Sequence, residues 1–415
     1  MLDRLCGIWG ISALVILAAR VCFCLPVTPL ERGAAWGASS RPEPAHNLIL
    51  FIGDGMGFEQ VKAAGMFRYG ASGTLSFESF PYRAEVTTHA ADSDIPDSAA
   101  TGTAIATGRK VNLGVVSLAI PGDRSELLTV LEFMQACGKS TGLVTTTYMT
   151  HVTPACFAAH EPWRGNTRNI AHDYLFQTRP NVLFGGRAPY DLGITAASAE
   201  AAGYRVVADS TGLFSLDTET ASRVSGQFWP SHLPYEYPHY PESVPHLWEM
   251  TDVALRILDN DPDGFFLMVE GGRIDHCCHL EGIECVVHET VAFDDAVQTA
   301  VDWADGREDT LIVVTADHET GGLQVVRNNG MGEYPEVTWD PPVNGARVHT
   351  GVDVPAYAWG RNAQMVSGTI DNTGFFRIFT AGVMQNDRSN INQDRSVDFL
   401  DLLILLNDWY KTSGP

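Results

Sequence analysis

The chain has 415 residues, of which 45% are hydrophobic and 19% are charged, enough apolar material for one large α/β domain with small additions. Its formal net charge is −23, which argues against nucleic acid or an anionic membrane as a partner. An anionic substrate would need local positive charge on such a surface, and metal ions would supply it.

The first 25 residues have the pattern of a secretory signal peptide. Arg4 precedes a nearly continuous apolar run, Leu5 to Ala19, which is short for a membrane span. An uncleaved anchor is the alternative, and the cleavage site stays open. Residues 26–46 are expected to form a linker. The sequence therefore predicts a protein that is secreted, periplasmic or at the cell surface.

Cysteine usage gives little sign of a stabilising framework. Three of the eight cysteines fall in or beside the signal, and the other five are Cys137, Cys156, Cys277, Cys278 and Cys285. An odd number without regular spacing is not a disulfide framework. No Cys-x-x-Cys pair is present, which argues against a thiolate zinc site.

Strand and helix signals alternate between residue 47 and about residue 380. Apolar runs predict strands at Leu48–Ile52, Tyr82–Thr88, Ser140–Thr147, Asn181–Gly185, Phe265–Val269 and Leu311–Thr315. Helices are predicted at Phe58–Tyr69, Asp97–Ala106, Glu126–Cys137, Leu247–Leu258 and Glu281–Trp303. The alternation predicts an α/β fold over residues 47–382, a three-layer α/β/α sandwich with a central, mainly parallel sheet.

Two segments interrupt this alternation. Residues 226–245 are rich in Pro, Tyr, His and Trp without a period, which predicts a loop insertion that could cover an active site. Residues 328–345 are rich in Asn, Gly and Pro, which predicts a second insertion.

The tail, residues 383–415, has a different character. From Asn390 to Asp401, polar oxygens occupy loop positions one, three, five, nine and twelve, the spacing of a calcium-binding helix-loop. Arg395 stands where such a loop needs glycine, so any Ca²⁺ site there would be weak. The tail resembles one half of a dockerin-type module that docks a partner; a plain amphipathic helix is the alternative.

Acidic residues stand at the ends of three predicted buried strands. Asp54 follows Leu48–Ile52 between two glycines, Glu270 ends the next such run, and Asp317 follows a third. Parallel strands bring their carboxyl ends to one edge of a sheet, where ligands bind. Acids that converge there repel one another unless cations bind between them. Each acid alone has a plainer interpretation, such as Asp54 capping the helix that begins near Phe58.

Histidines accompany these acids. Asp275 and His279 are four residues apart, so on a helix they share one face, and His318 directly follows Asp317. Carboxylate with imidazole suits zinc, whereas carboxylate with hydroxyl and water suits magnesium.

Ser98 is the candidate nucleophile. It stands in Asp97-Ser-Ala-Ala-Thr-Gly-Thr103, at the expected start of a helix. The amides and the positive dipole end of a helix N-terminus suit a phosphoryl oxygen or an alkoxide. A neighbouring zinc would lower the pKa of the serine. The alternative is a simple helix cap.

Five ordered motifs together resemble those of the alkaline phosphatase family. They are Ile52-Gly-Asp-Gly-Met-Gly57, Asp97-Ser-Ala-Ala-Thr-Gly-Thr-Ala104, Val269-Glu-Gly-Gly-Arg-Ile-Asp-His-Cys-Cys-His279, Thr315-Ala-Asp-His-Glu-Thr-Gly-Gly322 and His349-Thr-Gly351. The resemblance covers roughly residues 44–380.

The resemblance implies two Zn²⁺ and one Mg²⁺ per chain. One zinc would be held by Asp275, His279 and His349. The other would be held by Asp54, Asp317 and His318, beside Ser98. The magnesium would be held by Asp54, Thr153 and Glu270, so that Asp54 bridges two metals.

The resemblance also implies a phosphate-clamping arginine. Arg164 stands eleven residues after Thr153, the family's offset, and Arg168 is the fallback. His151 and His276 replace an acid and a lysine of the best-known bacterial pattern, and are expected to lie just behind the ligands. Losing a carboxylate there leaves open whether the third ion is magnesium or zinc.

These features predict a secreted, metal-dependent phosphomonoesterase. Through a phosphoserine intermediate it would convert small phosphate monoesters to an alcohol and inorganic phosphate, with a homodimer as the expected assembly. Hydrolysis of phosphodiesters or sulfate esters is the nearest alternative. Thr153 and Glu270 favour the monoesterase, and the sulfatase signature is absent at Ser98. A non-catalytic metal-binding surface interaction protein is the alternative from another class.

Overall fold

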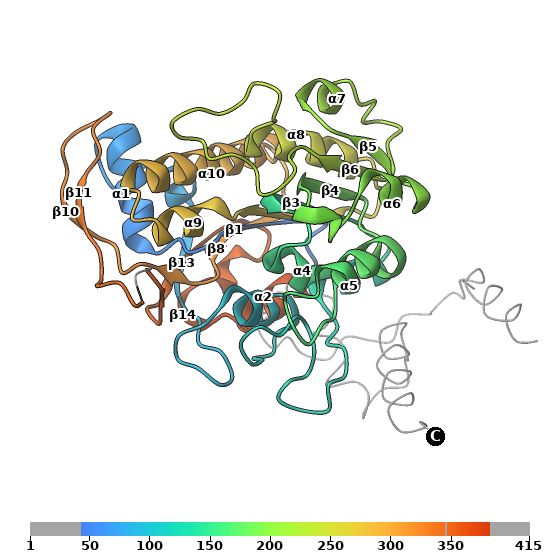
Figure 1. Cartoon of the computed structure of the whole chain (residues 1–415), viewed down its shortest axis with the longest axis horizontal. Helices are drawn as coiled ribbons and strands as arrows, with labels where there is room; N and C mark the ends of the chain where they lie inside the picture. The colour runs from blue at the N-terminus through green and yellow to red at the C-terminus, as the bar shows by residue number, and fades with distance from the viewer. Residues whose placement is uncertain (1–42, 345–346, 382–415) are drawn as a thin grey trace, which may run out of the picture. The chain divides into compact units, whose positions relative to one another are not determined.

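The structure is a computed structural model that describes residues 43–344 and 347–381 (Figure 1). The predicted signal peptide and the predicted calcium-binding tail lie outside the described residues, as does most of the predicted linker. Within the described ranges, no helix is long and apolar enough to span a membrane.

A ten-stranded sheet forms the middle layer. Its strands are β1 (Asn47–Gly53), β2 (Tyr82–Thr87), β3 (Ser140–Tyr148), β4 (Val182–Gly186), β5 (Arg205–Val207), β6 (Val224–Gln227), β7 (Phe265–Gly271), β8 (Thr310–Ala316), β13 (Val354–Gly360) and β14 (Gly368–Asp371). Their order is β14-β2-β13-β8-β1-β7-β3-β4-β6-β5. Among these ten, β13 runs antiparallel to both its neighbours, and the other pairings are parallel.

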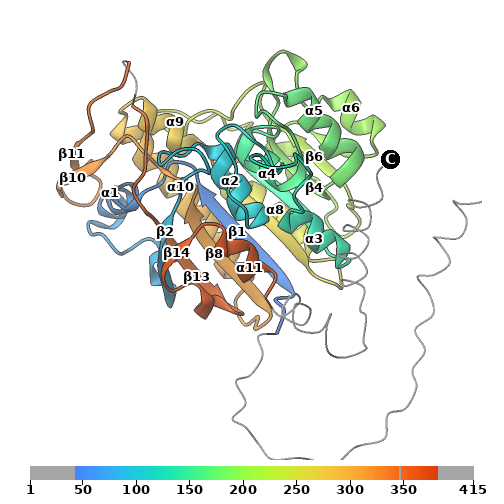
Figure 2. The same ribbon diagram turned by 90° about the horizontal axis from the view of Figure 1, so that it is seen from below.

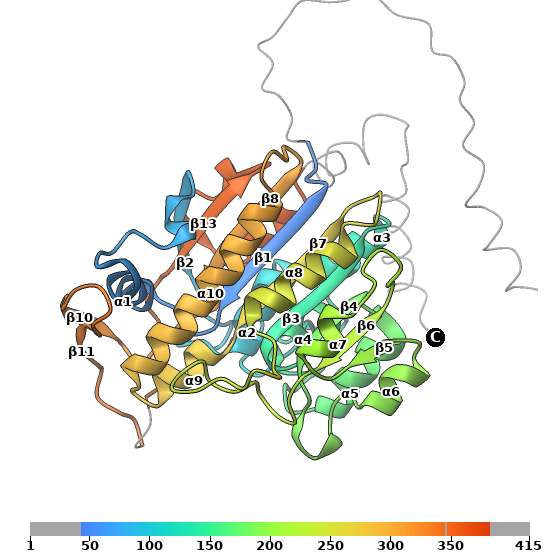
Figure 3. The same cartoon turned by 90° about the horizontal axis from the view of Figure 1, so that it is seen from above.

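Helices cover both faces of the sheet. They are α1 (Phe58–Tyr69), α2 (Ser98–Thr107), α3 (Val130–Ala136), α4 (Val152–Ala158), α5 (Thr167–His172), α6 (Ala196–Ala201), α7 (Ser210–Phe214), α8 (Leu247–Leu258), α9 (Arg273–His279), α10 (Ile283–Trp303) and α11 (Gly374–Phe379). Figure 2 shows α2, α3, α4 and α11 in front of the sheet, and Figure 3 shows α8 and α10 in front of the opposite face. The predicted three-layer α/β/α sandwich with a mainly parallel sheet is therefore confirmed.

The register of three central strands places the acidic residues at the same edge of the sheet. Strand β1 lies between β7 and β8, and all three are buried along their full length. Ile52 pairs with Glu270 on one side and with Thr315 on the other. Their apolar side chains are packed from both faces, as parallel strands in such folds require. The chain therefore leaves β1 and β8 at one edge of the sheet, and Asp54 and Asp317 are the residues that directly follow these strands.

Some element bounds differ from the prediction. The predicted helix Glu126–Cys137 begins only at Val130, because Glu126 forms a bridge to Leu118 and Thr129 caps the helix in a reciprocal pair with Glu132. The predicted helix Glu281–Trp303 begins at Ile283, because Glu281 has a positive φ of 57° that no helix accommodates.

The two predicted insertions have different structures. Residues 226–245 begin at the end of β6 and then run without helix or strand to the start of α8. Residues 328–345 include β11 (Glu336–Thr338), which pairs antiparallel with β10 (Gln324–Arg327). A further pair joins β9 (Glu319–Thr320) to β12 (His349–Thr350), with His349 opposite Thr320 and Thr350 opposite Glu319.

Candidate active site and metal centres

Carboxylate and imidazole groups converge at the carboxyl edge of the central strands. Three groups have one donor atom per residue, all within 4.8 Å of one another: Asp275 with His279 and His349, Asp54 with Asp317 and His318, and Asp54 with His151 and Glu270. The first two groups contain the residues expected from the sequence. The third contains His151, which was expected to lie behind the ligands. Asp54 belongs to two groups, because β1 is the middle strand of the three.

Several oxygens in these groups are buried without a hydrogen-bond partner. They are Oδ1 of Asp54, Oγ1 of Thr153, Oε1 of Glu270 and Oδ2 of Asp317. Buried oxygen atoms of this kind are destabilising unless a donor or a cation satisfies them. Their chemistry and their grouping fit metal ions.

The pKa values of the buried carboxyls show the same need for cations. Burial, reinforced by the negative charge of Asp317, raises the pKa of Asp54 well above its ordinary value. Burial raises the pKa of Asp317 to about 8 and that of Glu270 to about 7. Bound cations would favour the charged forms and reverse these shifts.

Asp275 is the exception among these acids. Burial acts to raise its pKa, but a hydrogen bond with His279 and the neighbouring His318 and His349 outweigh that effect and hold the pKa below the ordinary value. Its Oδ1 also accepts a hydrogen bond of 2.6 Å from Thr320 Oγ1. Asp275 is therefore held as a carboxylate even before any cation binds.

His279 and His349 each direct one ring nitrogen toward Asp275. The Nδ1 atom of His279 lies 2.6 Å from the carbonyl oxygen of Arg347, and Nδ1 of His349 lies 2.9 Å from that of Pro96. Their Nε2 atoms lie 3.2 and 3.6 Å from the carboxylate of Asp275. A neutral ring that donates Nδ1–H to a carbonyl can offer the lone pair of Nε2 to a cation that displaces the Nε2 proton, and metal-binding histidines are oriented in this way.

Ser98 is the first residue of α2. Asp97 caps this helix, because its side chain accepts a hydrogen bond from the amide of Ala100. The hydroxyl oxygen of Ser98 lies 3.2 Å from Nε2 of His318, and the side chain is almost fully buried. The structure thus places the hydroxyl at a helix N-terminus and beside the second group of candidate ligands.

Arg164 is held next to Ser98 through Asp97. Its Nη1 lies 3.2 Å from Oδ2 of Asp97, and its backbone amide donates to Gly114. The amide of Gly114 donates in turn to Asp97. Arg168, the fallback, is exposed on α5. Of the two candidate arginines, Arg164 is the one held beside Ser98.

Sequence reasoning missed His232, which belongs to the irregular segment 226–245. Its ring centroid lies 4.6 Å from that of His276 and 5.4 Å from that of His151. Burial lowers the pKa of His232 to about 3 and that of His276 to about 4, so these rings are neutral. The His- and Tyr-rich composition of the segment was the available signal for this contact.

A disulfide bond was not anticipated either. Cys277 and Cys285 are bonded and join α9 to α10 across the turn that follows His279. Cys137, Cys156 and Cys278 are free thiols. The bridge braces the helix that carries Asp275.

Comparisons with known proteins agree on one family. The profile described as alkaline phosphatase matches residues 45–341. The chain is 33% identical to the streptomycin-6-phosphate phosphatase of Streptomyces griseus over 416 residues, which covers 83% of this chain and 92% of that protein. It is 30% identical to alkaline phosphatase 3 of Bacillus subtilis over 445 residues, covering 86% and 94%.

Solved structures show the same fold. The alkaline phosphatase of the Antarctic bacterium TAB5 superimposes with a TM-score of 0.70 at 25% identity, covering 82% of this chain and 98% of that one. The alkaline phosphatase of Thermus thermophilus superimposes with a TM-score of 0.72 at 24% identity, covering 92% and 100%.

Proposed function

This chain belongs to the alkaline phosphatase family and is a metal-dependent hydrolase of phosphate monoesters, and we propose that Ser98 is the nucleophile of that reaction. One observation carries the proposal: the Ser98 hydroxyl stands at the N-terminus of α2, 3.2 Å from His318, with Arg164 held beside it by Asp97. A nucleophile, a cation-binding group and an oxyanion clamp therefore share one site.

We assign the metals to the three groups of donors. Asp275, His279 and His349 would hold one Zn²⁺, and Asp54, Asp317 and His318 would hold the second. Asp54, Thr153 and Glu270 would hold Mg²⁺, the third ion. The imidazole of His151 within reach of that site supports zinc as a competitor for it.

The protein groups have distinct tasks in the proposed reaction. Zinc bound at the first two sites would supply a Lewis acid that lowers the pKa of the serine and stabilises the leaving oxygen. Ser98 loses its proton and attacks phosphorus; the bond to the ester oxygen breaks, and the alcohol leaves with a proton. Arg164 and the amides at the start of α2 hold the phosphoryl oxygens. Water then hydrolyses the phosphoserine to inorganic phosphate and restores the hydroxyl.

Two measurements test this assignment. The purified chain, mixed with a phosphate monoester and quenched in acid, is digested and searched by mass spectrometry for a phosphate group on Ser98. Metal content and monoesterase rate are followed together through chelation and stepwise return of Zn²⁺ and Mg²⁺. A phosphate group on another residue, or full activity in the chelated chain, contradicts the assignment.

The same preparation separates the alternative chemistries. Rates on an aryl phosphate monoester, a diester and a sulfate ester are compared, and we expect the monoester to be hydrolysed fastest. Bound zinc without hydrolysis of any of the three would favour a metal-binding interaction protein. Because one relative is named for streptomycin-6-phosphate, an aminocyclitol phosphate belongs in the panel beside the aryl monoester.

We further propose that the chain is exported and acts as a homodimer. The apolar run after Arg4 supports export. Cell fractionation tests the location, and sedimentation equilibrium of the metal-loaded chain tests the dimer.

A further inference from the structure

A cavity of about 300 Å³ borders the paired strands β9 and β12. It is lined partly by Glu319 of β9 and Thr350 of β12. Side chains alternate between the two faces of a strand, so His349 and Thr320 face the other way. The hydrogen bond from Thr320 to Asp275 shows that this other face is the metal-binding side. The two short strands therefore form a wall between the cavity and the candidate zinc site.

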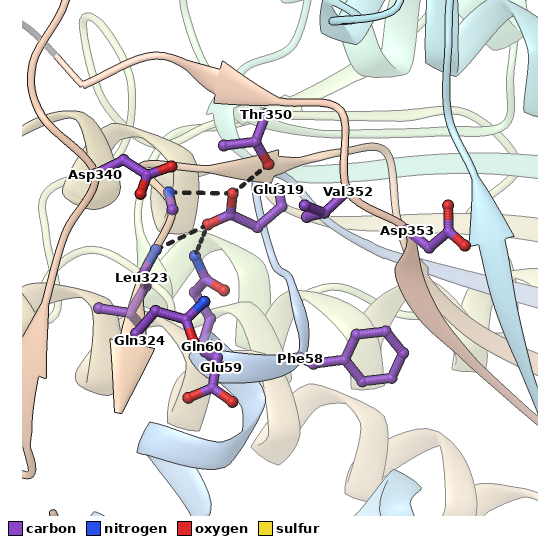
Figure 4. A pocket seen from close by; sticks show the side chains of 11 residues that line it. Phe58, Glu59, Gln60, Glu319, Leu323, Gln324, Asp340, Thr350, Val352 and Asp353 are labelled. Carbon is purple, nitrogen blue, oxygen red and sulfur yellow. Dashed lines mark hydrogen bonds between the residues drawn. The ribbon is translucent and has the colours of Figure 1, made fainter. Parts of the chain in front are cut away.

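Glu319 is the most heavily bonded side chain on the cavity side (Figure 4). Its Oε1 accepts hydrogen bonds from Gln60 Nε2 at 2.8 Å and from the amide of Leu323 at 3.3 Å. Its Oε2 accepts from Thr350 Oγ1 at 2.5 Å and from the amide of Gly322 at 3.2 Å. Glu319 as a whole is only 5% exposed. Four donors thus converge on two buried oxygens.

This arrangement requires a carboxylate. A glutamine at position 319 would present an NH₂ group in place of one oxygen, opposite two donors. Gln60 cannot turn its amide round in response, because its Nε2 also donates to the carbonyl oxygen of Thr320 at 3.0 Å. An acceptor is therefore needed on both sides of the Glu319 side chain, and a buried donor left without one is destabilising.

The bond to Thr350 matters because it anchors, through a side chain, a strand of only two residues. The strand has two residues, His349 and Thr350, paired with β9. The Nδ1 atom of His349 is held by the carbonyl oxygen of Pro96, and the hydroxyl of the next residue, Thr350, is held by the Glu319 carboxylate. Loss of the second contact would leave the backbone that carries the His349 ring held by its pairing with β9 and by the bond from the Gly321 amide to the Val348 carbonyl, without a side-chain anchor at Thr350.

We propose that Glu319 is a positioning residue, which acts through Thr350 to place Nε2 of His349 for metal binding. The inference rests on the proposed function, in which His349 holds a zinc ion. Partners that orient a ligand from behind in this way usually change metal affinity by roughly 10- to 100-fold when they are removed. Glu319 itself touches neither the metal site nor the substrate, so its effect should appear in zinc affinity.

Zinc affinity, measured by competition with a chromophoric chelator, tests the proposal. Glu319→Gln should bind the ion at the His349 site roughly 10- to 100-fold more weakly. Thr350→Val, which removes one donor and keeps the shape, should weaken it in the same direction, and Thr350→Ser should restore it. Excess Zn²⁺ should recover the activity of Glu319→Gln. Glu59→Gln is the matched control, because Glu59 lines the same cavity but bonds to Val325 and Lys62.

His349→Ala separates failure of this inference from failure of the proposed function. If that variant keeps the full zinc content, the metal assignment itself is wrong. If it loses an ion while Glu319→Gln and Thr350→Val bind zinc as tightly as the unaltered chain, Glu319 has no positioning role and the metal assignment stands. Should Glu319→Gln fail to fold, as judged by circular dichroism of the metal-free chain, equal zinc affinity in Thr350→Val and Thr350→Ser would overturn the proposal.

Discussion

The hydroxyl oxygen of Ser98 and Nε2 of His318 lie 3.2 Å apart, although 220 positions separate the two residues in the chain. The contact joins the start of α2 to the short turn between β8 and β9. It places the proposed nucleophile against a candidate zinc ligand, so loss of the hydroxyl should affect the chemistry and leave the metals in place.

Ser98→Ala should therefore lower the rate of monoester hydrolysis by at least about a thousand-fold, since a nucleophile acts only in the reaction itself. Its zinc content should equal that of the unaltered chain, and no acid-stable phosphoserine should form. Ser79→Ala, at an exposed position, is the control. A Ser98→Ala chain that still accumulates a phosphoenzyme would refute the assignment.

Arg164 should contribute mainly to phosphate binding. Replacing it by Ala removes charge-assisted hydrogen bonds, so KM for a phosphate monoester and the inhibition constant of inorganic phosphate should each rise roughly 10- to 100-fold. Arg164→Lys should restore only part of the phosphate affinity, because lysine lacks the planar, two-pronged guanidinium group of arginine. Arg168→Ala serves as the control, and equal losses at Arg164 and Arg168 would count against the assignment.

Asp54 should be needed for two ions at once. In Asp54→Asn the second zinc and the third ion should both be depleted after dialysis, because Asp54 belongs to both groups of donors. Glu270→Gln should deplete the third ion alone. Elemental analysis of both variants provides the test, and loss of a single ion from Asp54→Asn would show that the carboxylate does not bridge.

The disulfide between Cys277 and Cys285 should stabilise the chain. It closes a loop of sequence separation 8, for which the entropic model gives about 2–3 kcal/mol. The free energy of unfolding of the Cys277→Ala/Cys285→Ala variant, measured in urea, should be lower by about that amount. Reductant should not lower the free energy of unfolding of this variant further. Cys137→Ala, a change at a free thiol, provides the comparison. Equal stability with and without reductant in the unaltered chain would contradict the prediction.

Stability should fall at alkaline pH through His160. Burial lowers the pKa of His160, but the hydrogen bond to Glu132 at 3.0 Å outweighs that and raises it to about 9. A histidine whose pKa is raised by folding binds more protons in the folded state. Its contribution is complete below the unfolded pKa of about 6.5 and is lost as the pH rises through 9.

The same ion pair also sets a limit on the acid side. The pKa of Glu132 is lowered: burial acts to raise it, but His160 outweighs that effect. Its contribution is therefore lost as the pH falls below the ordinary range of a glutamate.

The alkaline effect of His160 is tested with the His160→Gln variant. Its free energy of unfolding, measured between pH 6 and 10, should decline less steeply than that of the unaltered chain. If the free energy of unfolding declines equally with pH in both chains, His160 is not the cause of the alkaline loss of stability.

The sequence was sufficient for the features that depend on local pattern. Leu48–Ile52 is apolar without a break, so a strand buried on both faces was predictable, and so was the position of Asp54 after it. The same reasoning placed Glu270 and Asp317 at one edge. Helices α1 and α8 have the predicted bounds; α1 ends at Gly70, a glycine in the left-handed conformation, and α8 has a strong apolar period.

Features that depend on contacts between distant segments could not be predicted. Strand β13 is antiparallel, and its direction depends on pairing with β2 and β8, which no local pattern encodes. His232 approaches His276 through a segment without period. The four bonds to Glu319 come from three separate parts of the chain, so the residue looked like one more polar position after His318.

The central position of β1 has a consequence for how the chain folds. This seven-residue, mainly apolar strand is the first of the sheet's strands to be synthesised, yet both its neighbours come much later in the chain. The amide of Gly55 meets the carboxylate of Asp317 across 262 positions. Pairings of such long sequence separation form slowly, and they leave an apolar strand exposed to aggregation in the meantime. Slow synthesis at low temperature, or added chaperone, should therefore increase the yield of folded enzyme more than added zinc does.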